Sequence, residues 1–382
     1  MASSTRFPKG LNTFHPRSIL STFPISPSAS QYILTEDFIP YQSGKYTVTT
    51  AVSGTVATFP FLAGAVKLAT SASATDTTYM MLNGAGFQLL PVNQAWFNAG
   101  VFYPRTVLNA NDTNIYIGWF DNSVPTSANN GVYFIKPSGG TAVHFVIKKG
   151  GTTTTFQNVA DLALPSGLYG DTNSVNGVLS STISSNAFTG VSVSTAGAGY
   201  QNMPMVLSTS TAGGTTGSVP VSVQIASTAF TTGNPSVPIQ STGLTYGSLS
   251  APYVVTPGSG FTNAGPLTTL LEVIPNIDLQ FYYNGKDVLY LGVNGRQILS
   301  IGSGGVIGVA AGATVNTATG IAPSYYSTTQ LSTAIAPFQP NTGSVANLMP
   351  LTPLNFAAGF ANTTANIRTF YIQDVYMGVE YN

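Results

Sequence analysis

The chain has 382 residues, of which 43% are hydrophobic and only 6% are Asp, Glu, Lys or Arg. Twelve basic and twelve acidic residues give a formal net charge of zero, whereas an ordinary protein carries about 25% charged residues. The length exceeds what one hydrophobic core usually supports, so we expect two folded units with accessory segments. A chain with so few charges tends to associate, and we expect a homo-oligomer, with a trimer as one candidate state.

The composition also excludes several classes of function. The balanced charge disfavours nucleic acid as a partner, because phosphate binding needs a clustered surplus of Lys and Arg. The chain contains no Cys, which excludes disulfides, thiolate nucleophiles and Cys-ligated metals. No run of about 18 apolar residues occurs, so no transmembrane helix is expected. His15 and His144 lie far apart, and we expect structural roles for both, with no metal site and no cofactor.

Residues 1–30 are expected to form an extended N-terminal arm. Four prolines in this stretch disfavour a helix or a central strand. A solvated tail is the alternative, but such a tail rarely carries so many large apolar side chains. We therefore expect the arm to dock on a partner surface through its basic and aromatic residues. These candidate binding residues are Arg6, Phe7, Lys9, Phe14, Arg17 and Phe23.

Strand patterns follow the arm, and no window has a convincing helical period. The runs are rich in β-branched and aromatic residues and are separated by turn residues. The runs that predict strands are Tyr46–Thr50, Ala95–Tyr103, Asn114–Phe120, Gly131–Ile135, Ala142–Lys148, Ile277–Tyr283, Val288–Val293, Gln297–Ile301 and Arg368–Val375. Asn294-Gly295 between two apolar runs predicts a tight hairpin. The fold class expected is an all-β antiparallel sandwich of the jelly-roll type, with residues 31–161 and 270–382 as its two parts.

Residues 162–269 interrupt this pattern. They contain a single charged residue, Asp171, and are dominated by Ser, Thr, Gly and Pro. A structureless loop of this length is uncommon inside a compact domain, and the alternation in Val219–Ile225 is typical of a strand. We therefore predict a small inserted β-domain, with a long mobile insertion as the alternative.

Enzymatic chemistry has little support in the sequence, so a non-enzymatic protein is expected. Sandwich-fold glycosidases use two carboxylates that flank the scissile bond. None of the three glutamates lies in a strand two or four residues from a second carboxylate, and the adjacent Glu36 and Asp37 would point to opposite faces. A lectin-like site could draw calcium-binding oxygens from Asn111–Asn114 and Asp121-Asn122, although such clusters are usually turn residues. Trp96 and Trp119 lie in strand runs and are expected in the core.

Several segments, taken in order, carry a family resemblance. They are Arg6–Asn12, Tyr32–Phe38, Leu279–Lys286, Val293–Gly295, Phe356–Gly359 and Arg368–Tyr376. With these segments the chain resembles tailed-phage virion proteins that have a concanavalin-like jelly roll. The resemblance implies a capsid decoration or cement protein on the outer capsid surface, whose partners are the major capsid protein and neighbouring copies of itself. The alternative is a tail-fibre or receptor-binding protein whose lectin-like sandwich binds a host-surface glycan.

Overall fold

The computed structural model describes most of the chain in separate ranges. These are residues 31–39, 41–59, 64–84, 86–90, 92–104, 113–169, 171, 174–184, 187–208, 222–225, 249, 252–256, 271–286, 288–302, 305–308, 314–316, 320–322 and 348–380. The predicted arm, with all of its candidate binding residues, lies outside the described residues. It therefore stays a prediction.

Nine strands form the larger of two antiparallel sheets. They are β1 (Gln31–Glu36), β3 (Thr55–Phe59), β4 (Ala65–Ala69), β6 (Gln94–Phe102), β17 (Asn276–Tyr283), β18 (Leu289–Val293), β19 (Arg296–Gly302), β20 (Gly305–Gly308) and β24 (Thr369–Glu380). Their order is β20-β19-β18-β17-β6-β24-β4-β3, and β1 pairs with β24. Strand β6 from the first part of the chain thus lies between β17 and β24 from the last part.

Seven strands form the second sheet. They are β2 (Tyr46–Thr50), β5 (Thr77–Leu82), β7 (Thr113–Phe120), β8 (Gly131–Lys136), β9 (Ala142–Lys149), β10 (Thr152–Asp161) and β23 (Asn355–Asn362). Their order is β10-β9-β8-β7-β23-β5-β2. Two short 3-10 helices, η2 (Ser43–Lys45) and η4 (Pro125–Ser127), lie in the connections. No helix among the described residues is long and apolar enough to cross a bilayer.

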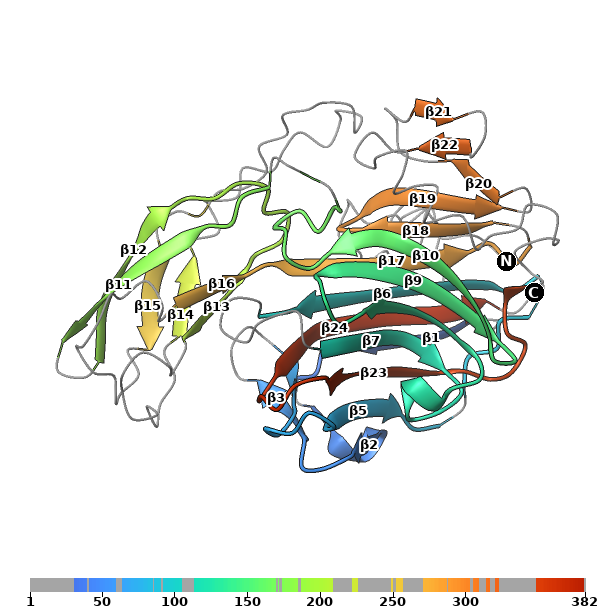
Figure 1. Ribbon diagram of the computed structural model, residues 1–382, viewed down its shortest axis with the longest axis horizontal. Helices are drawn as coiled ribbons and strands as arrows, with labels where there is room; N and C mark the ends of the chain where they lie inside the picture. The colour runs from blue at the N-terminus through green and yellow to red at the C-terminus, as the bar shows by residue number, and fades with distance from the viewer. Residues whose placement is uncertain are drawn as a thin grey trace, which may run out of the picture.

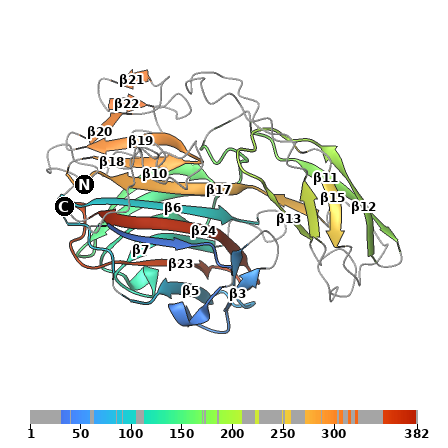
Figure 2. The same ribbon diagram turned by 180° about the vertical axis from the view of Figure 1, so that it is seen from behind.

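The two sheets pack face to face (Figures 1 and 2). One large hydrophobic core lies between them. Because successive side chains of a strand point to opposite faces, β6 contributes alternate residues such as Phe97 to this core. The ring of Phe97 stacks on Phe281 of β17 with a centroid distance of 5.2 Å. In the second sheet Trp119 stacks on Phe87 at 4.9 Å. The expected all-β antiparallel sandwich is confirmed.

A smaller unit of paired strands projects from one end of the sandwich (Figure 1). Its strands are β11 (Val178–Ser184), β12 (Ala187–Thr195), β13 (Met205–Ser208), β14 (Ser222–Ile225), β15 (Pro252–Thr256) and β16 (Leu271–Ile274). They pair as β11-β12, β13-β16 and β14-β15. We call the described residues from 171 to 274 the inserted module.

The inserted module has a hydrophobic cluster of its own. Its buried members are Leu179, Ile183, Tyr200, Val206, Leu249, Leu271 and Val273. Strand β16 leads directly into β17 of the sandwich through Pro275, so one extended segment belongs to both units. The expected β-structure within the insertion is therefore present as paired strands with this cluster.

A further pair of strands lies outside the insertion. It consists of β21 (Thr314–Asn316) and β22 (Gly320–Ala322), which follow β20.

Candidate functional site

Two carboxylates come together on the outer face of the nine-stranded sheet. On β6 the residues that alternate with the core residues, including Gly100, face away from the core. Gly100 lies opposite Asp278 of β17 on one side and opposite Asp374 of β24 on the other. The two aspartates therefore flank one glycine from two neighbouring strands, and we call them the carboxylate pair.

A β-bulge sets the position of Asp374. The register between β24 and β6 shifts between Ile372 and Asp374, so Gln373 is the extra residue. Ile372 lies opposite Val101, and Asp374 lies opposite Gly100. Since a one-residue change of register turns every side chain to the other face of a strand, the bulge brings Asp374 into line with Asp278.

The glycine leaves room for the two side chains to approach each other. A Cβ atom added to Gly100 would lie 2.4 Å from Oδ1 of Asp374 and 3.3 Å from Oδ1 of Asp278. The same point is 3.5 Å from Oδ1 of Asn276, which precedes Asp278 by two residues and shares its face. Three oxygen atoms thus converge on the space that any larger residue at position 100 would fill.

Asn202 of the inserted module holds one side of the carboxylate pair. Its Nδ2 atom donates hydrogen bonds to Oδ2 of Asp278 at 3.1 Å and to Oδ1 of Asn294 at 3.2 Å. Oδ1 of Asn294 also accepts a hydrogen bond from the backbone N of Asp278 at 2.7 Å, and its Nδ2 donates to the carbonyl of Ser166. These bonds occupy Oδ2 of Asp278 and leave its Oδ1 directed toward Gly100.

Burial and mutual repulsion disfavour charge on both carboxyls. The pKa of Asp278 is raised to about 7 by burial and by the charge of Asp374, against the opposing hydrogen bond from Asn202. Burial also raises the pKa of Asp374 to about 6. Neither carboxyl forms an ion pair within the described ranges. Near neutral pH the pair is therefore expected to hold a proton or to gain from a positive ligand.

An aromatic cluster lies on the same outer face, further along the strands. Trp96 of β6 and Tyr282 of β17 are 2% and 6% exposed, and they pack with Tyr290 and Tyr376. The hydroxyl of Tyr282 donates a 2.7 Å hydrogen bond to Oε1 of Gln94. Because Trp96 and Tyr282 are buried, neither ring offers a free face for stacking against a sugar.

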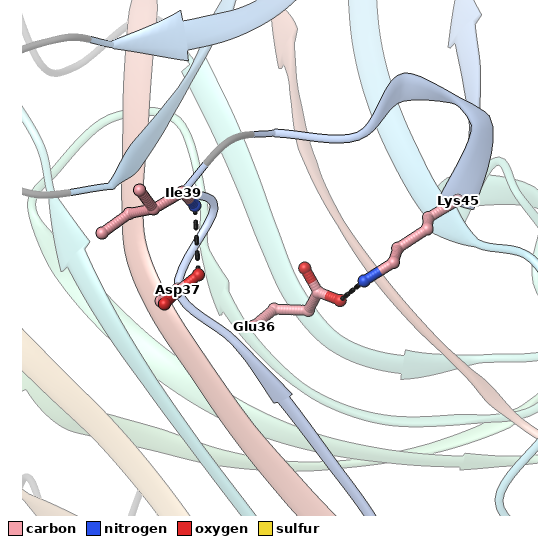
Figure 3. A network of polar contacts seen from close by, with 4 residues as sticks. All are labelled: Glu36, Asp37, Ile39 and Lys45. Atoms are coloured by element: carbon pink, nitrogen blue, oxygen red, sulfur yellow. Dashed lines mark hydrogen bonds and ion pairs between the residues drawn. The ribbon is translucent and has the colours of Figure 1, made fainter.

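The adjacent carboxylates at the end of β1 have separate roles. Glu36 pairs with Nζ of Lys45 at 2.8 Å, whereas Oδ1 of Asp37 accepts a hydrogen bond from the backbone N of Ile39 at 3.0 Å (Figure 3). Glu36 is 7% exposed, so its charge is balanced where it is buried. The expectation that these two carboxylates do not act together agrees with this geometry.

The oxygen-bearing residues considered for a lectin-like calcium site stabilise turns instead. Oδ1 of Asp121 accepts from the backbone N of Asn129 at 3.0 Å, and its Oδ2 accepts from Nδ2 of Asn130 at 2.9 Å. Oδ1 of Asn114 accepts from the backbone N of Ser138, and Oδ1 of Asn122 from that of Val124. Residues 111 and 112 lie outside the described residues.

The remaining residues singled out from the sequence have structural environments. Nδ1 of His144 accepts a hydrogen bond from the backbone N of Asn158 at 2.9 Å, and burial lowers the pKa of His144. Trp119 is fully buried in the main core, as expected, and its Nε1 lies 3.0 Å from the sulfur of Met377. Trp96 is buried on the outer face, away from the main core. His15 lies outside the described residues.

Sequence reasoning missed the carboxylate pair. The pattern expected of a glycosidase was two carboxylates in one strand, whereas Asp278 and Asp374 come from different strands and meet across β6. Each was the only acidic residue in its predicted strand run, Ile277–Tyr283 or Arg368–Val375. A lone acidic residue in a strand that is otherwise largely apolar was therefore the available signal.

Comparisons with known proteins add little to this geometry. No protein-family model matches the chain, and no curated protein matches it. One similar solved structure is a protein of unknown function from Shewanella oneidensis MR-1, with 9% identity, a TM-score of 0.36 and coverage of 94% of this chain and 91% of that one. Another is an endo-1,3-beta-glucanase from Streptomyces sioyaensis, with 7% identity, a TM-score of 0.38 and coverage of 94% and 99%.

Proposed function

We propose that this chain is a non-enzymatic structural protein of a tailed-phage virion, a decoration or cement subunit on the outer capsid surface. The observation that carries the proposal is the uncharged surface of the inserted module. Between residues 171 and 274 the sequence contains only two charged residues, Asp171 and Glu272. Glu272 is 6% exposed, so the described surface of the module consists almost entirely of neutral groups.

A neutral projecting unit is suited to contacts between subunits. Burying charged groups requires partners that compensate for the lost hydration. This surface carries almost no charged groups, so its burial needs almost no such compensation. Val175 and Val178 are 49% and 38% exposed and would bury apolar area in such a contact. Burial of one such side chain contributes up to about 1.5–3 kcal/mol, and many copies of a weak contact would together stabilise a shell.

The arm supplies the second part of the proposed mechanism. Phe7, Phe14 and Phe23 would fill apolar grooves on the major capsid protein or on a neighbouring copy. Arg6, Lys9 and Arg17 would pair with acidic groups on the same surface. Ordering the arm costs conformational entropy that these contacts must exceed.

Location and copy number on the particle test the proposal. A decoration subunit is expected on the outside of the head in hundreds of copies, and electron microscopy of purified particles with quantitative mass spectrometry would measure both. A few to tens of copies at the tail would contradict the capsid role. Deletion of residues 1–25 is expected to weaken binding to capsids, and unchanged binding would refute the arm mechanism.

A receptor-binding protein with a lectin-like sandwich is the second candidate. The carboxylate pair and the neighbouring aromatic cluster on one sheet face favour it, because sugar sites combine polar groups with aromatic rings. The burial of Trp96 and Tyr282 counts against it. Saturable binding on a glycan array that is lost on replacing Asp278 would favour this candidate over the capsid role.

A further inference from the structure

Three side-chain oxygens converge over Gly100, and no hydrogen-bond donor from the described residues lies between them. They are Oδ1 of Asp278, Oδ1 of Asp374 and Oδ1 of Asn276, all within 3.5 Å of the point that a Cβ of Gly100 would occupy. Oxygens that converge in this way repel each other unless a proton or a cation lies between them. The arrangement therefore requires a positive partner.

The amide of Asn276 is the independent sign that this partner is a ligand. Asn276 is 9% exposed, and its Oδ1 is buried without a hydrogen-bond partner among the described residues. Its orientation is fixed, because its Nδ2 donates a 2.6 Å hydrogen bond to Oε1 of Gln373. A buried acceptor left unsatisfied costs free energy, and an ion at the carboxylate pair would satisfy it.

We propose that Asp278, Asp374 and Asn276 bind one divalent cation, with Ca²⁺ as the preferred ion, at the junction of the inserted module and the sandwich. Ca²⁺ is held by carboxylate and amide oxygens with solvent molecules completing its shell, and it accepts irregular geometry. Mg²⁺ is smaller and demands a near-octahedral shell. Two carboxylates would balance the charge of the ion.

Two neighbouring residues would hold the ligands of such an ion in place. Asn202 holds Oδ2 of Asp278, and Gln373 holds the amide of Asn276, so both would fix the ligands in place. The described residues contain no cluster of three His, Cys, Asp or Glu side chains. The proposed site differs from such a cluster, because its third ligand is the amide oxygen of Asn276.

The ion would also tie the inserted module to the sandwich. Asn202 belongs to the segment between β12 and β13, and its bond to Asp278 crosses from the module to β17. An ion that keeps Asp278 charged strengthens this bond, since hydrogen bonds to ionised acceptors are stronger. This inference does not rest on the proposed virion role.

The test uses the full chain, freed of metal with a chelator and then titrated with CaCl₂. Isothermal titration calorimetry is expected to give one saturable site per chain, and saturating Ca²⁺ is expected to raise Tm by at least about 2 °C. MgCl₂ is expected to bind more weakly. No saturable Ca²⁺ binding to the full chain would overturn the proposal, since this measurement depends on no variant.

Two variants test whether the ion binds at the carboxylate pair. Asp374→Asn keeps the shape of the side chain but removes one charge, so it is expected to be at least as stable as the parent without metal and to lose the Ca²⁺-dependent shift in Tm. Gly100→Ala puts a Cβ where the oxygens converge and is expected to weaken Ca²⁺ binding at least tenfold. Asp37→Asn and Gly140→Ala are the matched controls, because Asp37 lies at an exposed turn and a Cβ at Gly140 would meet nothing within 4 Å. Ca²⁺ binding equal to that of the parent in Asp374→Asn would place the ion elsewhere and overturn the proposal.

Discussion

Asn202 and Asp278 are joined by a 3.1 Å hydrogen bond between Nδ2 and Oδ2, although they lie 76 positions apart in the sequence. Asn202 belongs to the inserted module, and Asp278 belongs to a central strand of the larger sheet. The same Nδ2 also contacts Oδ1 of Asn294 and the carbonyl oxygen of Asn276. One amide therefore links the module to three residues of the sandwich.

Replacing Asn202 by Ala is expected to lower the free energy of unfolding by about 1–2 kcal/mol, because a hydrogen bond to a carboxyl is lost. Urea denaturation measures this change, and hydrogen exchange should show faster exchange of the backbone amides in the segment between β12 and β13. Asn122→Ala is the control, since Asn122 lies in an exposed turn. Equal losses in the free energy of unfolding for the two substitutions would mean that the hydrogen bonds of Asn202 add no more stability than those of an exposed turn.

The metal-free protein is expected to lose stability as the pH rises from about 4 to about 7. The folded-state pKa values of Asp278 and Asp374 are raised to about 7 and about 6, whereas an unfolded Asp titrates near 3.9. The folded chain therefore binds more protons across this window, and the free energy of unfolding falls with increasing pH, by roughly 1.4 kcal/mol for each pKa unit by which a carboxyl of the pair is raised.

Other groups act in different directions, so a variant is needed to isolate this effect. The lowered pKa of His144 makes stability rise with pH just below 6.5, and the lowered pKa of Asp76 acts only below about 4. Urea denaturation of the parent and of Asp374→Asn in EGTA, at intervals between pH 4 and 8, gives the difference. Parallel curves for the two proteins would show that the carboxylate pair does not titrate in this range.

The hydroxyl of Tyr200 is expected to stabilise the core of the inserted module. It accepts a 2.9 Å hydrogen bond from the buried backbone N of Gly177, and Tyr200 is 1% exposed. Tyr200→Phe leaves that N–H group buried without this acceptor and should cost about 1–3 kcal/mol. Urea denaturation is the measurement, and Tyr32→Phe, at a position 40% exposed, should have little effect. A change of the same size in both variants would argue against a specific role of the Tyr200 hydroxyl.

Local patterns were enough to predict much of the fold. Asn294-Gly295 predicted a hairpin, and the structure pairs Val293 with Arg296 across that turn, with φ of 49° at Asn294 and 75° at Gly295. The prediction holds because positive φ is a property of these two residue types. Strands β2, β6, β7, β8, β9, β17, β18, β19 and β24 lie where apolar and β-branched runs placed them, with ends shifted by a few residues.

Other strands depend on pairing that the sequence does not reveal. Strands β3 and β4 have five residues each and include several Ala and Thr residues, which carry a weak or ambiguous strand signal. They form because β4 pairs with β24 and β3 then pairs with β4. The predicted arm and most of residues 209–270 lie outside the described residues, so their predictions stay untested.

The candidate site could not be predicted from the sequence for a similar reason. Asp278 and Asp374 meet only because β6 separates their strands and because a bulge at Gln373 sets the register. Without the bulge, regular pairing would place Gln373 opposite Gly100 in place of Asp374. Neither the strand order nor a one-residue bulge can be inferred from local composition.

Substitutions on the surface of the inserted module test the contact proposed for it. Val175 and Val178 are exposed, so Val175→Asp with Val178→Asp is expected to change Tm very little. If the neutral surface packs against other subunits, two buried carboxylates would weaken that contact strongly, and binding to capsids or self-association should fall at least tenfold. Sedimentation of the protein with purified capsids and analytical ultracentrifugation of the protein alone are the measurements. Leu351→Asp, at an exposed position of the sandwich, is the control. Unchanged binding and unchanged self-association of the double variant would show that this surface faces solvent in the assembled state, and the module would then need a different role.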